Sequence, residues 1–191
     1  NVGLAHVGTF GSRSAIAAEK AALFAELPSD AWLVHDGADP ELLEAIRATQ
    51  ARKVPYDNND AVRLVHRRVH GARTQWTLRF PDGERIADVP TRSLEIASDL
   101  MAAATAAFLL GVPADALVER LAHIELGPTR QEIWRSPHGV TLINDSYSSD
   151  PMSVAAALRT ESLQDHRGKR IFVFGGMSGL GERSPHEHRA I

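Results

Sequence analysis

The chain has 191 residues, of which 43% are hydrophobic and 24% charged, with no cysteine and a formal net charge of -3. This is ordinary globular composition, and the length allows one large domain or parts of two. The mild acidity gives no reason to expect a nucleic-acid or membrane surface. The lack of cysteine excludes disulfides, thiolate nucleophiles and cysteine-based metal sites. The longest apolar run, residues 100–112, is too short to span a bilayer.

The two ends of the chain suggest a fragment. The sequence begins at Asn1 with no signal-peptide pattern, and it ends at Ile191 within a predicted helix. We therefore expect a piece of a longer protein, for which a cytoplasmic location is compatible with the composition.

Two strands and two helices are predicted in the first fifty residues. The apolar stretch 1–7 is typical of a buried strand, as is 32–34. Residues 13–27 and 41–49 repeat their apolar side chains at helical spacing. The inward positions are expected to be Ile16, Leu23, Phe24 and Leu27 in the first helix, and Leu42, Leu43 and Ile46 in the second.

Lys20 and His6 are the polar residues of this region that invite a functional interpretation. Lys20 lies four residues after Ile16 and four before Phe24, so it falls on the apolar face of its predicted helix. A lysine placed there ordinarily extends its ammonium group to water. A histidine at a strand end is ordinarily a satisfied core residue. From the residues alone, these structural interpretations are preferred.

The middle of the chain predicts an antiparallel meander followed by two helices. Apolar and polar residues alternate through 62–64, 76–80 and 86–89, with glycine and proline turns between the runs. Residues 93–110 then form an alanine-rich helix, and 113–123 a second one.

A Gly-Pro break at Gly127 separates two patterns. After it the pattern changes to strand, turn, strand, loop, helix and strand, which predicts domains at 1–127 and 128–191. Strands are expected around Trp134 and at 140–143, and a helix at 151–163. The apolar run RIFVF, residues 170–174, is expected to be a buried strand parallel to 140–143.

Two loops of the second part could bind a ligand. The stretch TLINDSYSSDP, residues 141–151, predicts a strand, a polar loop and a helix start, where ligands bind in parallel α/β sheets. Asp150 and Pro151 suit the cap and first turn of that helix, so an ordinary turn is the alternative. The glycine-rich loop 175–181 could admit a phosphate, but it also serves a tight turn and is not a GxxxxGK[ST] loop.

Four separated motifs together resemble the Mur ligase family. They are AHVGTFGSRSAIAAEKAALFAEL, GPTRQE, LINDSYSSDP and GGMSGLGERSPHEH, in the family's order and spacing. The resemblance is nearest to members that add D-alanyl-D-alanine to a UDP-muramoyl-tripeptide, and it is weak over residues 36–89. It implies an α/β fold: part of a central ATPase domain, a mixed sheet with helices, followed by the start of a Rossmann-like C-terminal domain. The family's UDP-binding domain, ATP phosphate loop and metal-binding glutamate have no counterpart in this sequence.

The resemblance also implies a reaction, cofactors and site residues. ATP would activate the muramoyl-peptide carboxylate as an acyl phosphate, which the amine of D-Ala-D-Ala attacks. His6 and a carbamylated Lys20 would be catalytic ligands of Mg²⁺. A histidine is an unusual ligand for this ion, so family resemblance carries that role. The nucleotide would be bound by the hinge residue Arg130 and by three residues of the second domain, Asn144, Asp145 and Tyr147.

Several departures from the family pattern keep alternatives open. Glu95 and Ile96 stand where a His-Asn pair near adenine is usual, and Gly176 and Gly179 replace two acidic residues. His188 matches a family histidine of less certain role, and a merely solvated histidine is equally compatible. One alternative is a non-catalytic binding half of a fusion with alanine racemase. Another is a ligase of the folylpolyglutamate or cyanophycin type, against which the DSY motif argues weakly.

Overall fold

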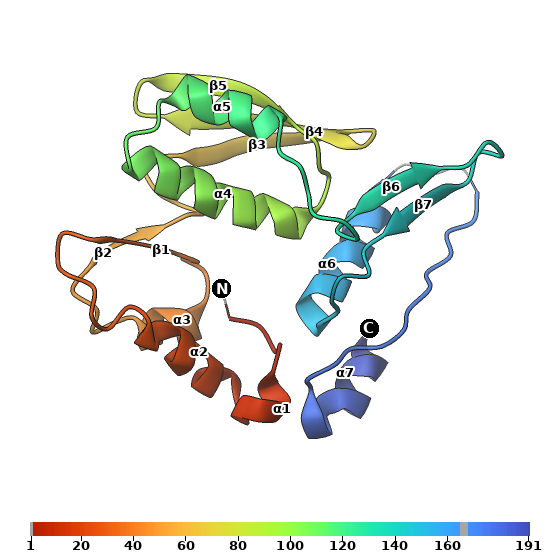
Figure 1. Cartoon of the computed structure of the whole chain (residues 1–191), viewed down its shortest axis with the longest axis horizontal. Helices are drawn as coiled ribbons and strands as arrows, with labels where there is room; N and C mark the ends of the chain where they lie inside the picture. Colours follow the sequence, from red (N-terminus) through yellow and green to blue (C-terminus); the bar gives the residue numbers. More distant parts are fainter. Residues whose placement is uncertain (1, 165–167) are drawn as a thin grey trace.

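The computed structural model describes residues 2–164 and 168–191. Three small sheets with helices packed against them make up the fold (Figure 1). The elements in chain order are α1 (Val7–Phe10), α2 (Arg13–Ala22), β1 (Trp32–His35), α3 (Pro40–Ala45), β2 (Arg52–Pro55), β3 (Arg63–His70), β4 (Arg73–Phe80), β5 (Gly83–Val89), α4 (Leu94–Leu109), α5 (Ala114–Ala122), β6 (Glu132–Arg135), β7 (Thr141–Asn144), α6 (Pro151–Ser162), the 3-10 turn η1 (Gly181–Arg183) and α7 (Ser184–Ala190). Within the described ranges no helix is long and apolar enough to cross a membrane.

The first sheet pairs β1 with β2 in parallel, from Trp32 opposite Arg52 to His35 opposite Pro55. Sequence patterns predicted β1 but not β2, because β2 begins with two exposed cations, Arg52 and Lys53, and has no apolar alternation. Helices α2 and α3 pack against each other on this sheet (Figure 1).

Helices α2 and α3 are shorter than their apolar spacing predicted. Helix α2 ends at Ala22, so Leu23 leaves the helical face and is 77% exposed. Helix α3 ends at Ala45, and Leu43 is likewise exposed. The inward positions predicted for these two leucines are therefore wrong: Leu23 lies in the turn 23–26 after α2, whereas Leu43 lies within α3 on a side of the helix that faces water.

The predicted meander is confirmed as an antiparallel sheet in which β4 lies between β3 and β5. Trp76, Leu78 and Phe80 alternate inward and are buried. Helices α4 and α5 cover them and form the first core cluster. Helix α4 also contacts β1, so it joins the meander to the first sheet (Figure 1).

The stretch 141–151 has the predicted order of strand, loop and helix. Strand β7 pairs with β6 in an antiparallel hairpin, with Ile133 opposite Ile143. Helix α6 begins at Pro151 and is capped by Asp150, whose carboxylate accepts the backbone N–H groups of Met152 and Ser153. The Ser153 hydroxyl in turn accepts the Asp150 N–H, which completes a capping box.

The N-terminal segment is not the strand that the apolar stretch 1–7 predicted. Side chains, rather than a neighbouring strand, satisfy its backbone. The Val2 N–H donates to Asp39, and the Val2 carbonyl accepts from the Arg13 guanidinium. Arg13 also pairs with Asp39 at 2.9 Å. This triangle fixes the chain next to α2 and α3 without ladder hydrogen bonds.

The predicted parallel strand at RIFVF is also wrong. Residues 170–174 have no regular structure, and Ile171 and Val173 are 81% and 97% exposed. The expected neighbour at 140–143 pairs instead with β6, and no described strand pairs with residues 170–174. A β-favouring sequence becomes a strand only where a neighbour accepts and donates its backbone hydrogen bonds.

This exposure gives a first testable prediction. Val173→Asp should change the free energy of unfolding of the 191-residue chain by no more than about 0.5 kcal/mol, because the side chain lies in water. Leu78→Asp, at a fully buried position of β4, should prevent folding. Urea titrations followed by tryptophan fluorescence compare the two. A loss of several kcal/mol in Val173→Asp would mean that the segment is buried after all.

A second core cluster connects the two ends of the chain. Val2, Val7, Ile16 and neighbours from β1 and α3 pack around Met177 and Leu180 of the glycine-rich loop. Met177 is 6% exposed and Leu180 is 2% exposed. The boundary between residues 127 and 128 stays a prediction, and this cluster draws side chains from both sides of it.

Candidate functional site

His6 lies at the start of α1 in an unusual conformation. Its φ of 64° places a non-glycine residue in the left-handed region, and its side chain is exposed rather than part of the core. The prediction of a satisfied core histidine is therefore wrong. Non-glycine residues in this strained conformation persist only where the surrounding structure stabilises them. They are found often at functional sites.

The glycine-rich loop packs directly against the His6 turn. The Gly8 N–H donates to the Gly179 carbonyl at 2.8 Å. A Cβ added to Gly8 would lie 2.6 Å from the Gly181 nitrogen, and one added to Gly179 would lie 3.4 Å from the His6 nitrogen. Backbone meets backbone here, which only glycine allows. The loop that sequence motifs assigned to the second part therefore closes over α1 of the first (Figure 1).

His188 holds this loop in place. Its Nε2 accepts the Met177 N–H at 2.8 Å, and its Nδ1 lies 2.8 Å from the Ser184 carbonyl. The two contacts require the neutral tautomer with the proton on Nδ1. The ring also lies 5.9 Å from that of Phe174. A merely solvated histidine is thus excluded in favour of a structural role.

Lys20 is exposed on α2, as expected of a lysine that extends its ammonium group from an apolar helix face to water. The helix turns Ile16, Ala17 and Ala21 into the core, and Lys20 lies among them by helical spacing. The described residues contain no group of three or more His, Cys, Asp or Glu side chains that could hold a metal ion. Magnesium takes mostly oxygen ligands, so His6 and Lys20 do not form a magnesium site by themselves.

Asp145 follows β7 and is engaged by Gln131. Its Oδ1 accepts the Gln131 backbone N–H at 3.3 Å, and its Oδ2 accepts the Gln131 side-chain amide. Asp145 is exposed and does not cap α6, since Asp150 does. Gln131 follows Gly127 closely in the sequence, and Gly127 is where the sequence predicted the domain boundary.

Three other predicted nucleotide-binding residues lie in the same loop region. The Arg130 guanidinium stacks over the Tyr147 ring, 3.9 Å from its centroid, and both side chains are exposed. Asn144 ends β7, where it contacts Glu132 at 3.5 Å and accepts the Ser146 hydroxyl at 2.7 Å. The fold thus brings Arg130, Asn144, Asp145 and Tyr147 together, whereas His6 and Lys20 lie on α1 and α2.

The start of α4 faces this loop. Desolvation raises the pKa of the Glu95 carboxyl, the nearby carboxylates of Asp150, Asp99 and Asp145 raise it further, and Arg130 opposes them. Desolvation also raises the pKa of Asp99, one turn along the helix. Glu95, which stands where the resemblance expects a histidine, therefore shares an electrostatic environment with the predicted nucleotide-binding residues.

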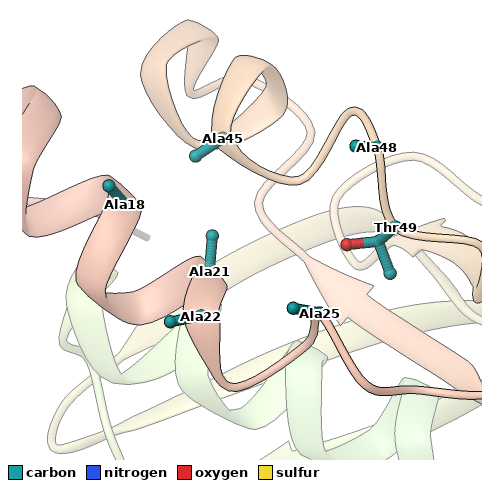
Figure 2. A pocket seen from close by; sticks show the side chains of 7 residues that line it. All are labelled: Ala18, Ala21, Ala22, Ala25, Ala45, Ala48 and Thr49. Carbon is teal, nitrogen blue, oxygen red and sulfur yellow. The ribbon is translucent and has the colours of Figure 1, made fainter.

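A hollow between α2 and the end of α3 is not a candidate site. Figure 2 shows its lining, which consists of small side chains: Ala18, Ala21, Ala22, Ala25, Ala45, Ala48 and Thr49. It offers no group for acid–base or metal chemistry. The hollow exists because alanines leave space where α2 and α3 pack together.

Sequence reasoning missed two residues that the structure places at the junction. Gln131 received no role, although it directly follows the predicted hinge arginine in TRQE. Arg92 precedes α4 and forms an ion pair with Glu161 of α6 at 2.8 Å, with the two side chains 8% and 13% exposed. No local pattern marks such a pair, because its members are 69 residues apart.

The model of the Mur ligase middle domain matches residues 1–107, more than half of the chain. The chain belongs to the Mur ligase family. This is a family of ATP-dependent ligases that form carbon–nitrogen bonds, and the resemblance seen in the four sequence motifs is confirmed.

Two relatives and one solved structure illustrate the similarity. The UDP-N-acetylmuramoyl-tripeptide--D-alanyl-D-alanine ligase of Bacillus subtilis is 27% identical over 191 residues, which are 99% of this chain and 41% of that protein. The enzyme of the same name from Synechocystis is 30% identical, covering 100% of this chain and 40% of the relative. The crystal structure of the MurF ligase from Thermotoga maritima in complex with ADP superposes with a TM-score of 0.84 at 23% identity, covering 100% of this chain and 44% of that one.

These matches confirm the predicted fold class, a mixed α/β Mur ligase middle domain. The chain spans about two fifths of the length of the relatives it matches. The roles of His6, Lys20, Arg130, Asn144, Asp145 and Tyr147 stay predictions.

Proposed function

We propose that this chain is part of a cytoplasmic, ATP-dependent ligase of peptidoglycan precursor synthesis. It would join D-Ala-D-Ala to a UDP-muramoyl-tripeptide. The observation that carries the proposal is the similarity to UDP-N-acetylmuramoyl-tripeptide--D-alanyl-D-alanine ligases along the whole chain, including the segments on both sides of Gly127.

The proposed reaction has two steps. The carboxylate of the muramoyl peptide attacks the γ-phosphorus of ATP, the bond to the β-phosphate oxygen breaks, and ADP leaves. The amine of D-Ala-D-Ala then attacks the acyl phosphate, loses a proton and displaces inorganic phosphate. Both steps depend on positioning and charge neutralisation.

Each predicted site residue has a role in this scheme. Lys20, converted to a carbamate by carbon dioxide, would supply oxygen ligands to Mg²⁺ together with His6. The remaining magnesium ligands would come from segments outside this chain. Asp145 would accept the ribose hydroxyls, Asn144 and Tyr147 would line the nucleotide, and Arg130 would reach its phosphates.

A non-catalytic role is the second candidate. Glycine stands at positions 176 and 179 and glutamate at 95, where the family resemblance expects two acids and a histidine. Such losses favour a binding or scaffolding half, for example beside a racemase.

Replacing Lys20 in the natural full-length protein tests the catalytic proposal. Lys20→Ala should lower kcat by about two orders of magnitude or more, because charge stabilisation by a bound metal is worth several kcal/mol. Phosphate release that requires both the muramoyl-tripeptide and D-Ala-D-Ala is the measurement. Lys20→Arg is the matched control, since it keeps the cation but cannot form the carbamate, and it should be equally inactive. A short carboxylic acid should partly restore Lys20→Ala. Full activity in either variant would refute the role of Lys20, whereas no activity in the wild-type protein would favour the scaffolding role.

A further inference from the structure

Two residues of the segment Thr129–Gln131 have strained backbone conformations. Thr129 has a φ of 61° and Gln131 a φ of 53°, so two non-glycine residues around Arg130 are left-handed. This conformation is especially unfavourable for a β-branched residue such as Thr129. The Gln131 side-chain oxygen Oε1 is also buried and has no hydrogen-bond partner among the described residues. An unsatisfied buried amide oxygen adds to the cost of the conformation.

Two contacts from the Asp145 loop hold the strained segment. Asp145 uses both carboxylate oxygens on Gln131, one for the backbone N–H and one for the side-chain amide. The Tyr147 N–H donates to the Thr129 carbonyl at 3.2 Å. Hydrogen bonds to a carboxylate are among the stronger ones, so Asp145 is the main restraint.

From this geometry we infer that Gln131 acts as a gate: it occupies Asp145 until a nucleotide hydroxyl displaces it. The displacement of Gln131 then relaxes the strained hinge, residues 129–131. The inference rests on the proposed contact between Asp145 and the nucleotide. Gln131 donates one hydrogen bond to each Asp145 oxygen, and a ribose diol that binds both oxygens needs the same bidentate arrangement, so the two compete for one face of the carboxylate.

The consequence is a coupling between binding and hinge movement. While Gln131 occupies Asp145, Arg130 is held between two left-handed residues and stacks on Tyr147. When a ligand takes the carboxylate, Gln131 loses the contact that keeps it left-handed. Arg130 is then free to turn away from Tyr147. The equilibrium lies between Asp145 bound to Gln131 and Asp145 released from it. A ligand shifts this equilibrium only if it binds one state more tightly, and a nucleotide hydroxyl would bind the released carboxylate.

The test is ADP binding by the natural full-length protein and its variants, measured by calorimetry with magnesium present. Gln131→Ala removes the side-chain competitor, so ADP should bind about three- to tenfold more tightly. Asp145→Ala removes the acceptor itself, so ADP should bind about 5- to 150-fold more weakly. The double variant Gln131→Ala, Asp145→Ala should bind ADP no better than Asp145→Ala alone, because without the carboxylate there is nothing for Gln131 to compete for.

Thr129→Gly is the matched control for flexibility. It relieves backbone strain at the neighbouring left-handed position but leaves both contacts of Asp145 in place, so it should not tighten ADP binding. Tightening equal to that of Gln131→Ala would overturn the inference, because hinge flexibility would then explain both variants. Unchanged or weaker binding in Gln131→Ala, with Asp145→Ala impaired, would also overturn it and leave the nucleotide contact intact. Unchanged binding in Asp145→Ala would instead refute the nucleotide contact on which the inference rests.

Discussion

Gly8→Ala should detach the glycine-rich loop from α1 and lower the free energy of unfolding by about 2–5 kcal/mol. The new Cβ would lie 2.6 Å from the Gly181 nitrogen and 2.9 Å from its Cα, and backbone atoms cannot step aside as a side chain can. Moving the loop breaks the hydrogen bond from Gly8 to Gly179 and exposes Met177 and Leu180. Burial of such side chains stabilises by about 1.5–3 kcal/mol each. This loss exceeds the 0.5–1 kcal/mol or so by which alanine is otherwise favoured over glycine in a helix.

Gly175→Ala is the matched control for this prediction. A Cβ at Gly175 meets nothing within 4 Å, and the backbone there needs no glycine conformation, so the change should stay within about 0.5 kcal/mol. Urea unfolding gives the free energies. Hydrogen exchange of the residue 8 amide reports the docking itself and should accelerate in Gly8→Ala. Equal stability of the two variants would mean that the loop does not rest on α1.

Glu161→Leu should destabilise the chain by about 3–5 kcal/mol. The substitution removes the carboxylate that pairs with Arg92 at 2.8 Å in the described part of the chain. The Arg92 side chain is only 8% exposed, and a buried charge that loses its partner carries a large desolvation cost. The pair joins the start of α4 to α6, so its loss also loosens the contact between the two parts of the chain.

Two further variants isolate the charge effect in the same urea titrations. Combining Arg92→Met with Glu161→Leu replaces the pair by apolar side chains and should recover most of the stability. Glu44→Ala removes one member of an exposed pair, in which Arg47 and Glu44 are 78% and 71% exposed, and should cost less than about 1 kcal/mol. A cost for Glu161→Leu no greater than that for Glu44→Ala would show that Arg92 and Glu161 are not buried together.

Elements with a local, self-contained signal were predictable from the sequence. The alternation of Trp76, Leu78 and Phe80 was sufficient for the meander, because each strand finds its partner within a few residues. Asp150 and Pro151 marked the start of α6 because a helix cap is formed by adjacent residues. The loop that carries Asn144, Asp145 and Tyr147 could be found for the same reason, since a polar run follows an apolar strand.

Elements that depend on a distant partner were not predictable. Residues 170–174 have every local feature of a strand, yet no described strand pairs with them, and the segment stays extended in water. Residues 1–7 looked equally strand-like, but Arg13 and Asp39 bind the backbone of Val2 instead. Local propensity cannot reveal whether a hydrogen-bonding neighbour exists, because that neighbour is supplied by the rest of the fold.

The sequence by itself determined the family of this protein and which residues are candidates for its chemistry, because the motifs keep their order and spacing along the chain. Only the tertiary structure decided how those residues are held. It placed the glycine-rich loop against His6, gave His188 a structural partner and exposed Lys20. It also engaged Asp145 with Gln131 beside the strained hinge. These outcomes depend on contacts between segments far apart in sequence, and packing, not local pattern, determines such contacts.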